Sequence, residues 1–354
     1  MPYMSVQHPH ERNVREQLVE LAQRYATPNP LHSTWQIVST LIPHLALNYV
    51  IYQNWNGPFW ITLALLTLNG LFLSRIFVLF HDVMHGSLFR SKRVSDTLGP
   101  LMGLLFFMPA HHWQYEHNFH HGSTNDLTRT GVGDMPILTV REYLALSPRR
   151  RLCYRILRHP AFLFTFHALY KQLIFTRVVA DKRWPRYVHL SVHFTNLAIV
   201  LTALTLWASG FGLVFLIQLL SYALGTPVML FLFYINHHFE QSRWYQPGEW
   251  NFIDCALHGS SIFLFPPVLR WFSAGIGIHN VHHLIPHIPN YRLERCWKDN
   301  EIFANSQVIS FWEGLKAMRL RLWDEQAGRY VGKEGYRFRS AEQAAEAGAT
   351  SLVN

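Results

Sequence analysis

Four long apolar stretches divide the chain, at residues 35–52, 59–80, 187–207 and 211–235. At a rise of about 1.5 Å per residue, each is long enough as a helix to cross a hydrocarbon layer of about 30 Å. Residues 53–58 join the first two stretches, and Ser209 and Gly210 join the last two, so each pair predicts a helical hairpin with a tight turn. Two hairpins place both chain ends and the long middle segment on the same side of a membrane.

The middle segment, residues 81–186, contains 15 Lys and Arg, whereas neither hairpin turn contains any. The positive-inside rule therefore places this segment in the cytoplasm. Residues 1–34 are polar and lack a signal-peptide pattern, which predicts a cytoplasmic amino-terminal arm. The net charge of +9 clusters between the two hairpins, so it favours a membrane face, and we expect no nucleic acid partner.

Three further segments complete the predicted architecture. Residues 98–110 are too short to span and contain Gly and Pro, which suits a re-entrant or interfacial segment. Residues 161–175 are amphipathic and flanked by Arg158 and Arg177, which indicates a helix along the lipid headgroups. Residues 331–354 are rich in Ala, Glu and Gly and predict a disordered tail. The prediction is an all-α membrane protein with four transmembrane helices in two hairpins, a cytoplasmic helical cap, and one membrane domain at residues 35–330.

Histidine is unusually frequent, with 22 residues against 22 for Asp and Glu combined. Nine histidines, counting one of the adjacent pair His237 and His238, form tight groups at the predicted cytoplasmic ends of the spans or in the cytoplasmic segments. His81 and His85 follow the second apolar stretch, and a continued helix would place both on one face. Two further groups share the form H-x-x-H-H: His117, His120 and His121; His279, His282 and His283. A weaker element, His237 with His238, follows the fourth stretch.

The spacing and number of these histidines predict two metal ions. Positions i+3 and i+4 diverge by about 100° around a helix, so one H-x-x-H-H helix can serve two adjacent ions. Eight or nine imidazoles exceed what one ion can bind. The three cysteines, Cys153, Cys255 and Cys296, form no C-x-x-C pair, and no H-E-x-x-H zinc protease motif occurs. Imidazole suits Zn, Cu, Fe and Ni, and elimination on chemical grounds favours iron.

Other residues near these groups are candidates for supporting roles. Four carboxylates could accept a hydrogen bond from the N–H of the second ring nitrogen of a ligand imidazole and fix its tautomer: Asp82, Glu116, Asp126 and Glu240. Each could equally be an ordinary solvated acid. Arg75, inside the second apolar stretch, would either reach the headgroups or join this outer group.

The histidine pattern resembles that of the membrane-bound fatty acid desaturases, from the first hairpin to about Arg295. In that family an H-x-x-x-H box and two H-x-x-H-H boxes bind a di-iron centre, and the eight box histidines here match them. The three-residue gap between His81 and His85 is similar to the acyl-lipid branch (Δ12, ω3 and bacterial Δ5). The segment F-Y-I-N-H-H-F-E, residues 233–240, resembles that branch's F-Y-x-Q-H-x-F-E, although Asn236 replaces Gln. The resemblance implies that His237, in preference to His238, is a ninth ligand.

The resemblance implies an O₂-dependent oxidoreductase that introduces a cis double bond into an acyl lipid, with two iron ions and O₂ as co-substrate. The chain has no H-P-G-G motif, which implies no fused cytochrome b5 domain and a separate electron donor such as ferredoxin. The resemblance also implies a multi-pass protein of the bacterial inner membrane, surrounded by membrane lipids. His279 replaces the Gln of front-end desaturases, which argues against that subgroup.

Two alternatives use the same histidines. A related di-iron hydroxylase or ketolase acting on alkanes, sphingolipids or carotenoids would share the hydrogen abstraction step, and the residues around His237 and His279 favour desaturation over it. A zinc or iron transporter would instead space its ligands through the membrane depth, whereas these groups gather at one face.

Overall fold

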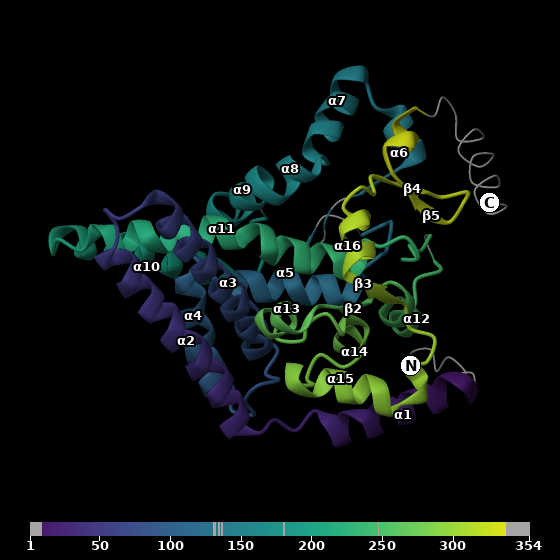
Figure 1. The fold of residues 1–354 in the computed structure, drawn as a ribbon. Coiled ribbons are helices and arrows are strands. Elements are labelled where there is room, and N and C mark those ends of the chain that lie inside the picture. Colours follow the sequence, from purple (N-terminus) through teal and green to yellow (C-terminus); the bar gives the residue numbers. More distant parts are fainter. Residues whose placement is uncertain are drawn as a thin grey trace.

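The computed structural model describes residues 9–337, apart from residues 130, 131, 134, 136, 180 and 247. Two long helical hairpins extend to one side of the molecule, and shorter helices and strands form a cap at the other side, where the described part of the chain begins and ends (Figure 1). The first hairpin is made of α2 (Pro30–Gln53) and α3 (Phe59–Met84), and the second of α10 (Arg186–Ala208) and α11 (Gly212–His237). Two helices follow the first hairpin, α4 (Lys92–Leu105) and α5 (Ala110–Ser123).

Three helices among the described residues are long and apolar enough to cross a membrane: α3, α10 and α11. Their ends differ from those of the predicted second, third and fourth spans by four residues or fewer. The predicted first span corresponds to α2, which has 24 residues but falls outside this set. We therefore count three candidate spans by composition, one fewer than predicted.

Helix α2 is less apolar because its buried face is polar. Gln36, Thr40, His44 and Asn48 follow one another at four-residue intervals and are all buried. The His44 Nδ1 lies 2.7 Å from the Oδ1 of Asn69 on α3, so this polar face packs inside the hairpin. Large apolar side chains occupy the exposed face: Trp35, Val38, Ile42, Leu45 and Tyr49.

Helices α3 and α11 pack against each other through two glycines. A Cβ on Gly70 would lie 2.6 Å from the carbonyl oxygen of Ser221, and a Cβ on Gly225 would lie 2.4 Å from the carbonyl oxygen of Gly70. Small residues at such a crossing let two membrane helices approach backbone to backbone. This close approach fixes the spacing of the two helices near their ends, where α3 carries His81 and His85 and α11 carries His237.

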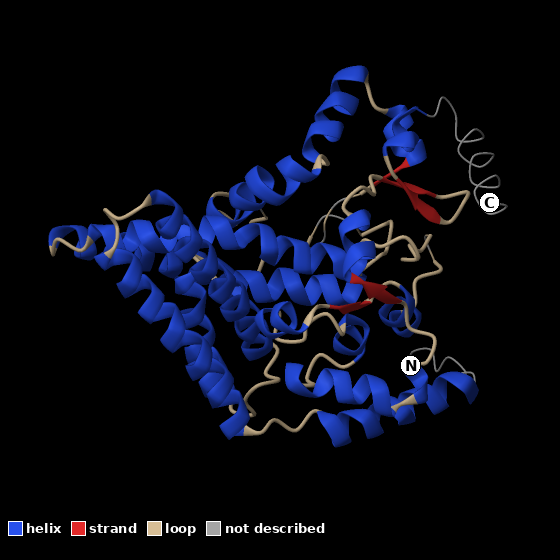
Figure 2. Cartoon of the chain, in the orientation of Figure 1, coloured by secondary structure: helices blue, strands red, loops and turns tan. Residues whose placement is uncertain are grey.

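The cap is mostly helical and contains two small sheets (Figure 2). One sheet has the order β1–β4–β5, and the other pairs β2 with β3 in parallel. Strands of two or three residues carry no readable alternation, which is why the all-α prediction missed them. The strands are β1 (Leu138–Thr139), β2 (Ile262–Leu264), β3 (Val308–Ser310), β4 (Leu322–Asp324) and β5 (Arg329–Val331).

Short helices supply the remainder of the cap, and α1 packs beside α15 (Figure 1). Residues 331–337, counted in the predicted tail, end β5 and form the 3-10 helix η4, while residues 338–354 lie outside the described residues. The remaining helices are α1 (Pro9–Tyr25), α6 (Val140–Ala145), α7 (Pro148–Leu157), α8 (Pro160–Phe162), the π-helix η1 (Leu163–His167), α9 (Ala168–Leu173), η2 (Phe175–Arg177), α12 (Phe252–His258), α13 (Pro267–Phe272), α14 (His279–Leu284), α15 (Asn290–Asp299), η3 (Glu301–Phe303), α16 (Phe311–Ala317) and η4 (Lys333–Arg337).

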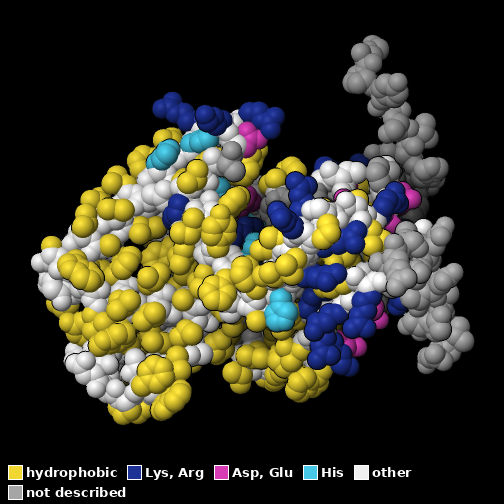
Figure 3. All heavy atoms as spheres, turned by 90° about the horizontal axis from the view of Figure 1, so that it is seen from above, with side chains coloured by type: hydrophobic (Ala, Val, Ile, Leu, Met, Phe, Trp, Pro, Cys, Tyr) yellow, Lys and Arg dark blue, Asp and Glu magenta, His cyan; other side chains and the backbone are white. Residues whose placement is uncertain are grey.

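The surface separates by chemistry along the same direction. Viewed from above, hydrophobic side chains cover the hairpin side, and Lys and Arg gather over the cap side and along one edge (Figure 3). Helix α10 contributes strongly to the apolar surface, since Phe194, Leu197, Leu204 and Trp207 are all exposed. Such a surface is stable against lipid and not against water, so the protein is a membrane protein.

Candidate metal centre

All nine histidines singled out in the sequence lie together in the structure, in two groups. The offered nitrogen atoms within each group lie no more than 4.8 Å apart. The first group takes His81, His85, His117, His121 and His282, and the second takes His120, His237, His279 and His283. Neighbours in sequence thus separate: His120 from His121, and His282 from His283, which is the arrangement that the 100° divergence predicts.

Local structure sets the first pair. Helix α3 continues without a break to Met84, so His81 and His85 lie one turn apart. Gly86 then takes a left-handed conformation, with φ of 70°. Its N–H donates to the carbonyl of Val83, and the N–H of Ser87 donates to the carbonyl of Asp82, which closes a Schellman turn. The helix therefore stops directly behind its second histidine.

The spacing of the imidazole nitrogens fits metal coordination. In the second group, the Nε2 of His237 lies 3.1 Å from that of His120 and 3.1 Å from that of His279. In the first group, the Nε2 of His121 lies 3.1 Å from those of His117 and His282. With metal–nitrogen bonds of about 2.1 Å, ligands at 90° lie about 3.0 Å apart and tetrahedral ligands about 3.4 Å apart. The observed distances are closer to the octahedral value.

Burial favours the neutral imidazole that a metal needs. The Nε2 atoms of His81 and His85 are buried, and no hydrogen bond within the described part of the chain reaches them. Burial, and after it the neighbouring imidazoles, hold the pKa values of His117 and His121 well below the ordinary value. Neutral imidazoles offer a lone pair, and a metal ion would compensate the buried nitrogens.

Hydrogen bonds to the opposite nitrogens orient two of these rings. The Nδ1–H of His81 donates to Asp82 Oδ1 at 2.9 Å, and the backbone N–H of Asn290 holds the other carboxylate oxygen at 3.0 Å. The Nδ1–H of His237 donates to the carbonyl of Gly259 at 3.3 Å. Both bonds point Nε2 into the cluster and increase its basicity.

The other three predicted carboxylates lie elsewhere. Glu116 is 3.9 Å from the Nδ1 of His112, a histidine outside both groups. Asp126 accepts hydrogen bonds from Thr128 and Arg129, and Glu240 is exposed. Of the four carboxylates, Asp82 is the one whose hydrogen bond to a clustered imidazole is seen in the described residues.

Arg75 and His238 occupy sites of their own. Arg75 is buried, donates to Thr40 Oγ1 at 3.0 Å and to the carbonyl of Trp271, and lies 4.0 Å from the centre of a Trp271 ring. His238 stacks on Tyr234 with ring centres 4.4 Å apart and belongs to neither metal group. Of the two adjacent histidines, His237 is therefore the one in the cluster.

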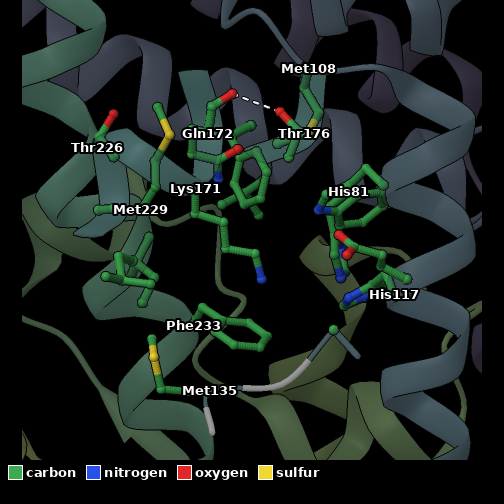
Figure 4. Close-up of a pocket in the computed structure, with 18 of the residues that line it drawn as sticks. His81, Met108, His117, Met135, Lys171, Gln172, Thr176, Thr226, Met229 and Phe233 are labelled. Carbon is green, nitrogen blue, oxygen red and sulfur yellow. Dashed lines mark hydrogen bonds between the residues drawn. The ribbon is translucent and has the colours of Figure 1, made fainter. Parts of the chain in front are cut away.

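An apolar cavity of about 380 Å³ opens onto the cluster. It lies between α3, α5, α9 and α11, and His81 and His117 of the first group line it together with His279 of the second (Figure 4). Most of its remaining wall is apolar: Phe77, Val78, Met108, Met229, Leu232 and Phe233. A saturated hydrocarbon chain fits this surface, and the cavity brings it to both histidine groups.

The sequence reasoning missed Trp113 and the cavity residues. Trp113 stacks on His117 with ring centres 4.4 Å apart, and it lies one helical turn before that histidine, a spacing that could have indicated it. Asn290 and most of the cavity residues leave no comparable sequence signal, because no spacing along the chain shows that their side chains meet around one cavity.

Comparison with known proteins identifies the family. The family model described as fatty acid desaturase matches residues 58–314, well over half of the chain. The chain belongs to the fatty acid desaturase family. A fatty acid desaturase of Bacillus subtilis is 35% identical over 318 residues, covering 90% of each chain. The predicted family is confirmed, and the protein is an oxidoreductase acting on fatty acyl chains, with the hydroxylase alternative not favoured.

More distant desaturase relatives have names that specify an acyl-lipid substrate or a donor. An sn-1 oleoyl-lipid 12-desaturase of Synechocystis is 26% identical over 268 residues, which is 73% of each chain. An sn-1 acyl-lipid omega-3 desaturase (ferredoxin) from the same organism is 24% identical over 250 residues, covering 65% of this chain and 64% of the relative.

Proposed function

We propose that the protein is an O₂-dependent di-iron desaturase that introduces a cis double bond into the acyl chain of a membrane lipid. The observation that carries this proposal is the division of nine imidazoles into two groups that both border one apolar cavity. One iron would be held by His81, His85, His117, His121 and His282, and the other by His120, His237, His279 and His283.

The chemistry explains the need for such a centre. A methylene group resists acids, bases and nucleophiles, and iron supplies the capacity to activate O₂ for hydrogen abstraction. Overall, two vicinal hydrogens leave the chain, and O₂ takes them up with two electrons and two protons to give two water molecules. The residues of this chain position the methylenes and exclude water: Phe77, Val78 and Met229 provide apolar contacts, and Asp82 fixes the orientation of His81.

We also propose that α2 spans the membrane as a fourth helix. Its outward side chains are apolar, with Trp35 and Tyr49 each about two-thirds exposed, and its polar face is buried against α3. A helix of this kind exposes apolar side chains to lipid while its polar groups hydrogen-bond internally. With 15 cationic residues between the hairpins and none in their turns, the metal centre would lie on the cytoplasmic side. We propose the bacterial inner membrane as its location, since a similar desaturase comes from the bacterium Bacillus subtilis.

The electron donor would be a separate ferredoxin. Two relatives, from Synechocystis and Nostoc, are named acyl-lipid omega-3 desaturases (ferredoxin). Ferredoxins are acidic as a class, and the Lys and Arg side chains over the cap give a surface of opposite charge (Figure 3).

Expression in a host that lacks the product, followed by mass spectrometry of its lipids, tests this function. We expect a new double bond in an acyl chain, which His283→Ala should abolish while the variant remains in the membrane fraction. Iron analysis of the purified protein should find two ions per chain. A product with an added oxygen and no double bond would contradict desaturation, and unchanged turnover in His283→Ala would contradict the site.

A further inference from the structure

Lys171 is a cation in the wall of the apolar cavity that opens onto the histidines, which we call the acyl cavity. It comes from α9 and lines the cavity, although most of the surrounding wall is apolar. Its side chain extends into the open centre, between Phe233 and the wall that carries His81 and His117 (Figure 4). No hydrogen bond or ion pair with another described residue holds its ammonium group. An ammonium in apolar surroundings is unfavourable unless an anion pairs with it.

The charges around Lys171 are mostly of the same sign. Burial lowers the pKa of His112, and the positive charges of Lys171 and Arg177 lower it further against the opposing charge of Glu116. Burial also lowers the pKa of His167, and the positive charges of Lys171 and Arg158 add to this effect. Glu116, an acid on the cavity wall, instead faces His112. The region therefore has an excess of positive charge that suits an incoming anion.

The outer face of the same segment places this region among lipids. Phe166, Tyr170 and Ile174 are between 56% and 69% exposed, whereas Lys171 is half-buried and turned inward. A segment with an apolar outer face and a cationic inner residue lies at the headgroup layer, where charged lipid groups and acyl chains meet.

We propose that Lys171 binds the anionic head end of the substrate while the acyl chain lies along the cavity toward the two histidine groups. This inference rests on the proposed acyl-lipid desaturation and specifies its substrate as an acyl chain with a negatively charged oxygen group near its carboxyl end. A phospholipid phosphate and a free carboxylate share this chemistry. Lys171 is thus a specificity residue that accepts either anion as a point charge.

Binding of three sixteen-carbon probes to the purified full-length protein tests the proposal independently of turnover. The probes are hexadecyl phosphate, palmitate and hexadecanol, and calorimetry gives their Kd values. We expect the anionic probes to bind about 10- to 100-fold more tightly than hexadecanol, because a hydrogen bond to a charged group provides that much discrimination. Preference for the phosphate assigns a phospholipid, and preference for palmitate assigns a free carboxylate.

Three variants identify the source of this preference. Lys171→Met should remove it and leave hexadecanol binding unchanged, while Lys171→Arg should retain it within about threefold. Lys182→Met removes a charge from an exposed loop and is the matched control, with no expected effect. In turnover, Lys171→Met should raise KM for the anionic lipid with kcat nearly unchanged. A preference that survives in Lys171→Met, or an equal loss of hexadecanol binding, would overturn the proposal.

These measurements also separate the two proposals. A wild-type protein that binds the anionic probes through Lys171 but forms no double bond in any lipid would refute the proposed function and leave the Lys171 site standing. A protein that desaturates lipids with the same KM in wild type and Lys171→Met, and that shows no anion preference, would refute the Lys171 site alone.

Discussion

The contact between Gly70 and Gly225 gives a sharp test of how the membrane helices position the metal centre. In Gly70→Ala, the new methyl group would lie 2.6 Å from the Ser221 carbonyl oxygen and 2.8 Å from the backbone nitrogen of Gly225. Ordinary contact begins at 3.4 Å. Since both neighbours are backbone atoms, no side chain can turn away, and α3 must move from α11 by about 0.8 Å.

This movement should reach the metal centre. Helix α3 ends in the segment carrying His81 and His85, and α11 ends at His237, so a change in helix spacing displaces ligands of both groups relative to each other. Overpacking of this kind destabilises a protein by about 1 to 3 kcal/mol, and a misplacement near 1 Å can lower the rate about 100-fold. We expect Gly70→Ala to lower the thermal midpoint in detergent, the iron content per chain and the desaturation rate.

Gly122→Ala is the matched control. Gly122 lies in α5 beside His121 but is exposed, and a Cβ there would meet no atom within 4 Å. Alanine in a helix is favoured over glycine by up to about 1 kcal/mol, so this variant should be as stable as the wild type or slightly more stable. Full iron content and an unchanged rate in Gly70→Ala would refute the argument that this crossing sets the ligand spacing.

Three further outcomes follow from the site. Asp82→Asn should weaken iron binding about 10- to 100-fold in a chelator competition, since the carboxylate that orients the neighbouring imidazole is lost; equal affinity would contradict that role. The thermal midpoint of metal-free protein should fall as the pH drops below about 6.5, because burial lowers the pKa values of His117 and His121 and only their unfolded forms take up protons there; a midpoint equal at pH 8 and pH 5.5 would count against it. Met229→Trp should narrow the cavity and shift the products toward shorter acyl chains in lipid mass spectrometry, and an unchanged chain-length profile would exclude Met229 as a limiting wall.

The membrane helices were predictable because their signal is local. An apolar stretch must be about as long as the bilayer is thick, and the predicted spans at 59–80, 187–207 and 211–235 differ from α3, α10 and α11 by only a few residues. The prediction for α2 depended on hydropathy alone and did not consider its polar stripe. The small sheets escaped because their pairing joins segments far apart in the sequence, such as Leu138 with Leu322.

Within the site, the spacing of the histidines along the chain predicts which of them can act together. Helix geometry converts the H-x-x-H-H spacing into two directions, so His120 and His121 had to diverge before any tertiary contact was known. The family resemblance implied His237, but its place beside His120 and His279 depends on packing, because α11 must meet α5 and α14. Only the tertiary structure decided that Asn290 holds Asp82 and that Lys171 enters the acyl cavity. Spacing within one helix follows from covalent geometry, whereas contacts between distant segments follow from packing, which no local pattern records.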